Sequence, residues 1–257
     1  MTLATPLLEA DSITLGYGNS GPVLADFGLA LNAGEIVTIL GPSGVGKSSL
    51  IRVLAGLQRP SAGRVAVAGS AIEGVHPRVA IAFQNPGLLP WLTLERNVGF
   101  GLSFKRQPRL AADDRRVRIE TAIRRVGLEH ARHRLPAELS GGMAQRAALA
   151  RCLARQPQVL LLDEPFGALD EITRADMQRL LLTVVRDFRT ATVLVTHDID
   201  EALLLSDRIV LLGGAPARQL AQWKIELPQP RDDSVAELGR IRIDIVQALH
   251  KAVVRHH

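Results

Sequence analysis

The sequence predicts an α/β protein in which a parallel-sheet core carries an amino-terminal antiparallel sheet and an inserted helical subdomain. A glycine-rich segment follows an apolar strand pattern at 35–40 and leads into a helical pattern, which is the order strand, loop, helix. Two more continuous apolar runs, at 159–162 and 191–195, are typical of strands buried on both faces of a parallel sheet. Between about 92 and 155, apolar residues recur at helical spacing and arginines occupy the other positions.

The first part of the chain supplies the antiparallel sheet and the first unit of the core. Ser12–Leu15 and Phe27–Leu31 alternate or cluster apolar residues as strands do, and we expect them to pair antiparallel. Glu35–Leu40 is apolar and β-branched, so it is predicted to be a core strand. Ser49–Ala55 is predicted to be a helix that ends at Gly56.

The remaining elements follow in order. Ile119, Ala122, Ile123 and Val126 predict a helix of the inserted subdomain, and a terminal helix is expected within Val235–Val254. We therefore predict one domain over 1–257, with a core of 1–86 and 156–214, a helical subdomain of 87–155 and a carboxyl-terminal extension of 215–257.

Composition excludes several classes of protein. The 257 residues include 31 Lys and Arg against 26 Asp and Glu, and this net charge of +5 is too small to predict nucleic-acid binding. Hydrophobic residues make up 47% of the chain, which excludes a disordered protein. Cys152 is the single cysteine, and the first ten residues contain Glu9 and no basic segment, so we expect no secretory signal and a cytoplasmic setting. Since the apolar runs are too short to span a bilayer, we expect no transmembrane segment.

One motif predicts a phosphate-binding loop. The segment 41–48 fits G-x-x-x-x-G-K-[ST] between a predicted strand and a predicted helix. Its glycines let backbone N–H groups converge on phosphate oxygens, the lysine neutralises the β- and γ-phosphates, and the serine hydroxyl can ligate Mg²⁺. The candidate ligands are Gly41, Pro42, Ser43, Gly44, Val45, Gly46, Lys47 and Ser48, with Ser49 following them.

Two carboxylates follow the apolar run 159–162. Asp163 and Glu164 come at the carboxyl end of this predicted strand, where open α/β sheets bind their ligands. Asp163 is expected to hold Mg²⁺ directly or through water, and Glu164 to polarise the water that attacks the phosphate. Such a pair is specific only in combination with Lys47 upstream.

The segment 139–146, Leu-Ser-Gly-Gly-Met-Ala-Gln-Arg, resembles the LSGGQ-type signature of ATP-binding cassette (ABC) ATPases. Ser140 can cap the helix that follows, and Gly141 and Gly142 allow backbone to approach an anion closely. Met143 stands where the signature often has Gln, a variant that other members share. The resemblance implies a P-loop NTPase (RecA-like) core, ATP and Mg²⁺ as cofactors, and ATP hydrolysis coupled to transport.

The other family motifs occur in the family's order between about residues 8 and 212, and their roles are those that the resemblance implies. Tyr17 is similar to the aromatic residue that stacks on adenine, and Gln84 to the glutamine that reaches Mg²⁺ and the catalytic water. Asp170, in Ala168-Leu169-Asp170, resembles the loop that crosses the dimer interface. His197 resembles the switch histidine that contacts the γ-phosphate.

The resemblance also implies partners. Two copies are expected to form a head-to-tail homodimer in which Ser140–Gly142 of one copy completes the ATP site of the other. Gln84-Asn85-Pro86-Gly87-Leu88-Leu89-Pro90-Trp91 is similar to ATPases of the taurine, alkanesulfonate and nitrate uptake group, and an exposed Leu88, Leu89 and Trp91 cluster fits a surface for a partner. This group implies a membrane permease, an external substrate-binding protein, and a peripheral place at the cytoplasmic face of the inner membrane.

Other functions stay open at this point. An ABC ATPase of DNA repair or translation usually resembles two cassettes in one chain or a cassette split by a coiled coil, and neither pattern occurs here. An exporter subunit is disfavoured by the Leu-Leu-Pro-Trp stretch at 88–91 but not excluded by it. A GTPase is disfavoured because the chain has no Asn-Lys-x-Asp guanine-reading motif.

Overall fold

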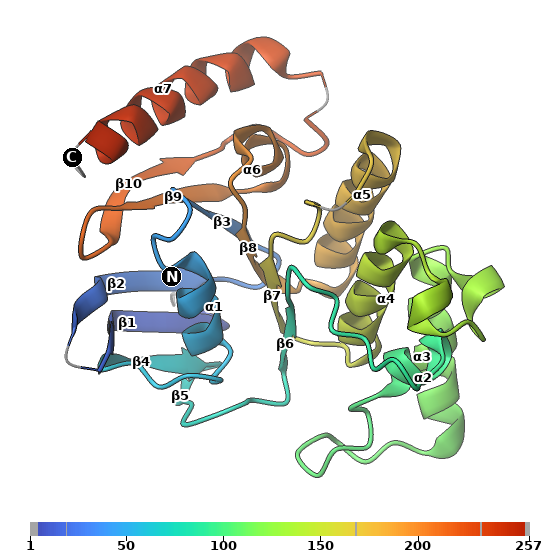
Figure 1. Ribbon diagram of the computed structural model, residues 1–257. Helices are drawn as coiled ribbons and strands as arrows, with labels where there is room; N and C mark the ends of the chain where they lie inside the picture. The colour runs from blue at the N-terminus through green and yellow to red at the C-terminus, as the bar shows by residue number, and fades with distance from the viewer. Residues whose placement is uncertain (1–4, 19, 168, 232, 255–257) are drawn as a thin grey trace. The chain divides into compact units, whose positions relative to one another are not determined.

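The computed structural model describes residues 5–18, 20–167, 169–231 and 233–254, and the chain divides into two compact units. The first unit is formed by the chain up to Val75 together with the chain from Ala191 onward, and the second by His76–Thr190. Both units combine strands and helices (Figure 1). The subdomain boundaries predicted from the sequence stay a prediction. Among the described helices, none combines the length and the apolar character that crossing a membrane requires.

An antiparallel sheet begins the first unit. It has the order β2-β1-β4-β5, with β1 at Leu8–Tyr17, β2 at Ser20–Leu31, β4 at Ala62–Val67 and β5 at Ser70–Ala71. Leu8 lies opposite Leu31 on one side and Val67 on the other. The predicted antiparallel pairing near the amino terminus is therefore confirmed, in strands longer than the sequence pattern indicated.

The second group of strands in this unit carries the phosphate loop. β3 (Ile36–Leu40) pairs in parallel with β8 (Ala191–Val195) and β9 (Arg208–Gly213), and β10 (Arg218–Lys224) runs antiparallel to β9. Every residue of β3 and β8 is buried, which explains their continuous apolar sequences. Ile39 lies opposite Val195, so the segments that follow the two strands leave the sheet at the same edge.

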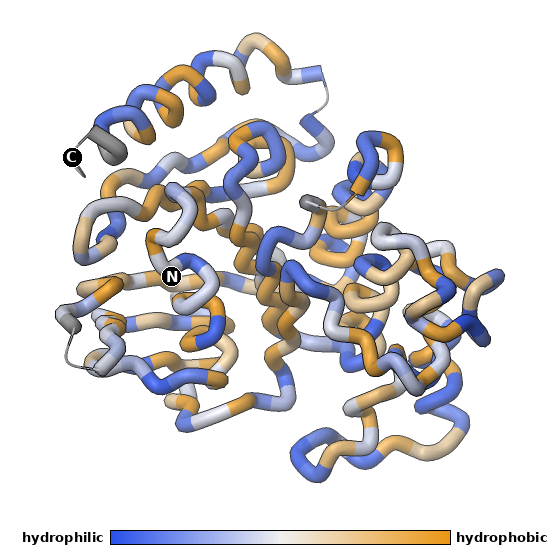
Figure 2. The backbone as a smooth tube through the Cα atoms, in the orientation of Figure 1, coloured by the Kyte–Doolittle hydropathy of each residue, from blue (hydrophilic) through white to orange (hydrophobic). Residues whose placement is uncertain are grey.

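Helices α1 (Lys47–Leu54), α6 (Ile199–Leu205) and α7 (Val235–Val254) complete the first unit. The last agrees with the predicted terminal helix. Leu238 and Ile245 of α7 are buried in a cluster with Leu203, Ile209 and Leu211. Figure 2 shows α7 alternating between hydrophobic and hydrophilic stretches, as a helix with one covered face does.

The second unit contains a parallel strand pair and four helices in its described part. Ala82, the last residue of β6 (Val79–Ala82), lies opposite Leu162 of β7 (Val159–Asp163). The helices are α2 (Leu94–Gly99), α3 (Ala112–Arg125), α4 (Gly141–Ala154) and α5 (Glu171–Phe188), with short 3-10 turns at Glu129–Ala131 and Pro136–Glu138. The apolar positions noted in the sequence, Ala122, Ile123 and Val126, are buried in the cluster that joins α2, α3 and α4.

Candidate functional site

The predicted phosphate loop connects β3 to α1, as the motif requires. Gly44 and Gly46 have φ angles of 81° and 99°, a region that glycine enters without strain. A Cβ atom on Gly41 would lie 2.7 Å from the backbone oxygen of Leu212, so the loop packs against β9 at a distance that only glycine allows. Since Gly46 offers no side chain to cap α1, the N–H groups of its first turn are suited to an anion.

The Lys47 side chain lies over the loop. It is 6% exposed, and its Nζ donates to the carbonyl oxygens of Gly41 at 2.8 Å and Pro42 at 2.9 Å. These bonds fix an ammonium group within the curve of the backbone. A fixed positive charge beside a helix N-terminus is the arrangement that recognises phosphate.

Tyr17 ends β1 and is 46% exposed. Its hydroxyl lies 2.8 Å from Ser49 Oγ and 3.4 Å from Gln58 Oε1, and the hydrogen bond with Ser49 is the main reason that the pKa of Tyr17 is lowered. Ser49 thus serves to hold the tyrosine. Ring stacking on a base, and a direct contact of Ser49 with the nucleotide, remain predictions.

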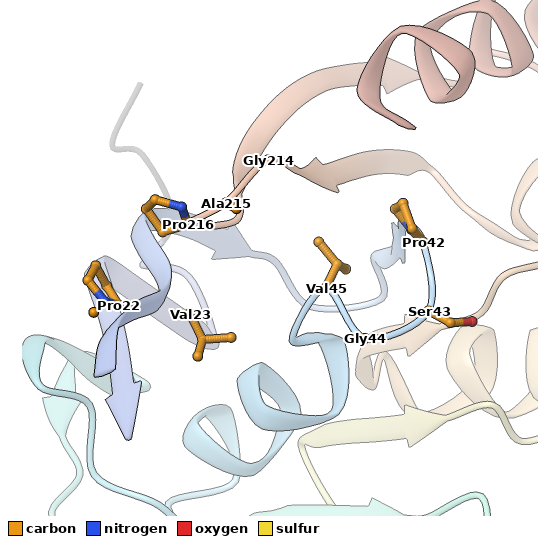
Figure 3. A pocket seen from close by; sticks show the side chains of 10 residues that line it. Pro22, Val23, Pro42, Ser43, Gly44, Val45, Gly214, Ala215 and Pro216 are labelled. Atoms are coloured by element: carbon orange, nitrogen blue, oxygen red, sulfur yellow. The ribbon is translucent and has the colours of Figure 1, made fainter. Parts of the chain in front are cut away.

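A recess of about 650 Å³ lies beside the phosphate loop (Figure 3). Its lining comes from the start of β2, from four loop residues and from the turn between β9 and β10: Gly21, Pro22, Val23, Pro42, Ser43, Gly44, Val45, Gly214, Ala215 and Pro216. A Cβ on Gly46 would lie 3.3 Å from a methyl group of Val23, so Val23 leaves little room for a side chain at this position of the loop. Sequence reasoning missed Val23, because an isolated valine within a strand carries no motif.

His197 follows β8 and precedes α6. It is exposed, and the pairing of β3 with β8 brings it to the edge of the sheet from which the phosphate loop emerges. Asp198 caps α6, since its carboxylate accepts from the N–H groups of Asp200 and Glu201. The histidine therefore stands on a short turn between a buried strand and a capped helix.

The second unit brings two predicted residues into contact. Gln84 and Glu164 each lie two residues beyond the paired ends of β6 and β7, and Gln84 Nε2 donates to Glu164 Oε2 at 2.9 Å. Glu164 has a φ of 47°, a left-handed conformation that costs free energy for a residue other than glycine. Asp163 ends β7 with 7% exposure. Because the amide nitrogen of Gln84 donates to Glu164, the amide oxygen of Gln84 is the atom that could ligate a cation.

Two helix starts hold the remaining predicted residues. Ser140 caps α4, with its Oγ accepting from Met143 N at 3.2 Å. A Cβ on Gly141 would meet no atom within 4 Å, whereas a Cβ on Gly142 would lie 3.3 Å from Leu169.

Asp170 caps α5 by accepting from Thr173 N at 3.0 Å, and this backbone bond is the main cause of the lowered pKa of Asp170. Ala168 lies outside the described residues.

The segment after Gln84 exposes less apolar surface than expected. Trp91 is 71% exposed, but Leu88 and Leu89 are half-buried, and Leu88 packs on the core of the helices. The reason is Asn97, a fully buried side chain that accepts from Leu89 N at 2.8 Å and donates to the carbonyl oxygens of Leu89, Leu92 and Thr93. No motif or spacing predicted this anchor.

The predicted residues therefore fall into two groups. The first unit holds the phosphate loop with Ser48 and Ser49, Tyr17 and His197, and the second holds Gln84, Asp163, Glu164, Ser140 with its glycines, and Asp170. Within the first group Tyr17 contacts Ser49, and within the second Gln84 contacts Glu164. Each group is a set of polar residues placed at strand and helix ends.

Comparison with known proteins decides the family. A family model described as "ABC transporter" matches residues 24–167, which is more than half of the chain. The chain belongs to the ABC transporter family. The resemblance inferred from the signature segment is thereby confirmed.

Two curated relatives match nearly all of the cassette. It is 47% identical to "Aliphatic sulfonates import ATP-binding protein SsuB 1" of Xanthomonas axonopodis pv. citri over 230 residues, covering 89% of this chain and 90% of the relative. It is 45% identical to "Aliphatic sulfonates import ATP-binding protein SsuB 2" of Burkholderia lata, covering 96% and 88%.

Solved structures confirm the predicted fold class. The "post-hydrolysis state of the ATP-binding cassette MJ0796 bound to ADP and Pi", a dimer, has a TM-score of 0.77 and 29% identity, and covers 86% of this chain and 100% of its own. The cassette cbiO1 of Clostridium perfringens, "part of the ABC transporter complex cbiONQ", also has a TM-score of 0.77, with 26% identity and coverages of 94% and 95%.

Proposed function

We propose that the cassette is the ATP-hydrolysing subunit of an importer for aliphatic sulfonates. The observation that carries this proposal is its identity of 41–47% to relatives named as import ATP-binding proteins for these solutes, over most of both chains. Those relatives support the choice of sulfonates within the broader group of sulfonate, taurine and nitrate importers that the sequence predicted.

In this proposal the first unit binds the nucleotide. The N–H groups of the loop and of α1 hold the phosphates, and Lys47 neutralises their charge. The Tyr17 ring, fixed by Ser49, stacks on the adenine. His197 reaches the γ-phosphate from the neighbouring strand end.

The second unit supplies hydrolysis. Glu164 accepts a proton from the attacking water, and the hydrogen bond from Gln84 fixes the orientation of that carboxylate. Gln84 and Asp163 of this unit offer an amide oxygen and a carboxylate, and Ser48 of the first unit is proposed to offer a hydroxyl; all three are the hard oxygen donors that suit Mg²⁺. When bound, this ion would neutralise charge that develops on the phosphate oxygens.

The proposed assembly contains two copies of the chain. Ser140, Gly141 and Gly142 form a capped helix start with open space at Gly141, which supports their predicted contact with phosphate bound by the other copy. Dimeric cassettes such as MJ0796 support this arrangement. Asp170 is assigned to the same interface, and its capping bond to Thr173 fixes the turn.

The assembly further requires a permease at the cytoplasmic face of the membrane and an external substrate-binding protein that delivers the solute. The 71% exposed Trp91, on a segment anchored by Asn97, is proposed as part of the surface that the permease contacts. No nucleic acid is part of this proposal.

Solute uptake by whole cells tests this function. A strain that lacks the gene should fail to take up a radiolabelled alkanesulfonate, and should regain uptake with the wild-type gene but not with Glu164→Gln at equal expression. Sulfate uptake in the same cells is the control. Unchanged alkanesulfonate uptake in the deletion strain would contradict the proposed cargo.

A further inference from the structure

The turn that carries His197 is closed by hydrogen bonds from both of its neighbours. Thr196 is 2% exposed, and its hydroxyl donates to Glu201 Oε2 at 2.7 Å. The same hydroxyl oxygen accepts from the backbone N–H of Asp198 at 3.1 Å. A continuous path of hydrogen bonds therefore runs from Asp198 through Thr196 to Glu201, and it passes around the histidine.

This path departs from the usual start of a helix. In a capping box, a Glu at the third helical position accepts directly from the N–H of the capping residue. Asp198 caps α6 and Glu201 stands at its third position, but here the Thr196 hydroxyl lies between them. The Thr196 hydroxyl connects the end of β8 to α6. His197 therefore lies between two residues, Thr196 and Asp198, that are joined by a hydrogen bond.

The burial of Glu201 indicates more than capping. The residue is 6% exposed, and a carboxylate removed from water loses hydration that an exposed capping glutamate keeps. The adjacent Ala202 is buried in the same apolar cluster as Leu40, the last residue of β3 before the phosphate loop. The bonds therefore hold the histidine turn on a helix that packs with the end of the strand from which the loop emerges.

We propose that Glu201 is a positioning residue, which acts through the Thr196 hydroxyl to hold His197 in place for hydrolysis. This inference rests on the proposed function, because it takes from it the role of His197. Neither Glu201 nor Thr196 contacts the nucleotide in this proposal.

Two pairs of variants separate positioning from stability. Glu201→Ala and Thr196→Val remove the acceptor and the donor, and each should lower kcat for ATP about 10- to 100-fold while the ATP dissociation constant changes less than twofold. Glu201→Gln keeps an acceptor oxygen and Thr196→Ser keeps the hydroxyl, so both should recover most of kcat. Asp200→Ala is the matched control, since this exposed neighbour pairs with Arg242 of α7 and lies outside the path.

The outcomes are distinguishable when melting temperature and nucleotide binding are measured on the same preparations. Loss of kcat in folded Glu201→Ala or Thr196→Val with nucleotide binding intact supports the inference; if one variant does not fold, the other decides. Wild-type kcat in both, or a loss confined to nucleotide binding, overturns it. If His197→Ala itself keeps wild-type turnover, the assigned role of His197 fails, and the inference falls with it.

Discussion

Three features of Glu164 support its proposed role as the general base. Its carboxylate accepts from Gln84, its backbone is held in a left-handed conformation, and it directly follows a fully buried strand. The strained backbone costs free energy, and it persists because β7 and the turn after it determine the local conformation. The same position therefore has a defined orientation before any substrate is present.

At the residue scale we predict that Glu164→Gln separates binding from hydrolysis. The amide keeps the size of the carboxylate but cannot take a proton from water, so turnover should fall about 10²- to 10⁴-fold with MgATP affinity retained. Size-exclusion chromatography with MgATP should then show the dimer accumulate. Turnover like that of the wild type would remove Glu164 from its role.

Lys47→Ala tests the phosphate loop. Loss of a charge-assisted hydrogen bond to phosphate should weaken ATP binding at least about tenfold, measured by titration calorimetry. Lys224→Ala is the matched control, because this exposed lysine pairs with Glu226 in a surface contact and is not part of the phosphate loop. Equal ATP affinities of the two variants would contradict the assignment of the loop.

Much of the site could be predicted residue by residue, because each motif combines a specific side chain with residues that favour a specific backbone conformation. Lys47 follows glycines with positive φ, and Ser140 begins a helix. Val23 and Asn97 could not be found in this way. Their contacts with Gly46 and Leu89 depend on packing between segments, which leaves no fixed spacing in the sequence.

At the scale of the element, Arg231 joins the end of α6 to the segment before α7. It is 2% exposed, and its guanidinium donates to four carbonyl oxygens, those of Leu203, Ser206, Ile225 and Leu227. Burial is the main cause of its lowered pKa. Since carbonyl groups at the end of a helix need donors, the arginine replaces a cap there.

Arg231→Leu should therefore lower the free energy of unfolding by about 2–4 kcal/mol, because it leaves buried carbonyl oxygens without a donor. Urea denaturation measures the change, and Arg240→Ala, on the exposed side of α7, is the control. A difference below about 0.5 kcal/mol between the two variants would show that the carbonyl groups find other partners.

The elements themselves were predictable where one pattern dominates. β3, β7 and β8 are apolar throughout because they are buried throughout, and α7 was predicted from its spacing. β5 and β10 are among the strands that were not predicted, since β5 has two residues and β10 is largely exposed along an edge. Such strands are determined by their pairing partner and carry little pattern of their own.

At the scale of the whole molecule, the candidate residues lie in two groups, one in each compact unit. The phosphate loop belongs to the first, and the Gln84–Glu164 pair and the signature serine belong to the second. The proposed function assigns both groups to the hydrolysis of ATP by a dimer of the chain. The account therefore predicts little hydrolysis below the concentration at which the chain dimerises, and full rates in a transporter that holds two copies together.

The most direct test of the account is to purify the chain from its native membranes in detergent, identify the integral protein that accompanies it, and measure ATPase activity with the substrate-binding protein and a panel of sulfonates and inorganic anions. We predict a polytopic permease in the complex and ATPase stimulation by alkanesulfonates. A chain recovered without any membrane partner, and fully active alone, would contradict the assignment to import.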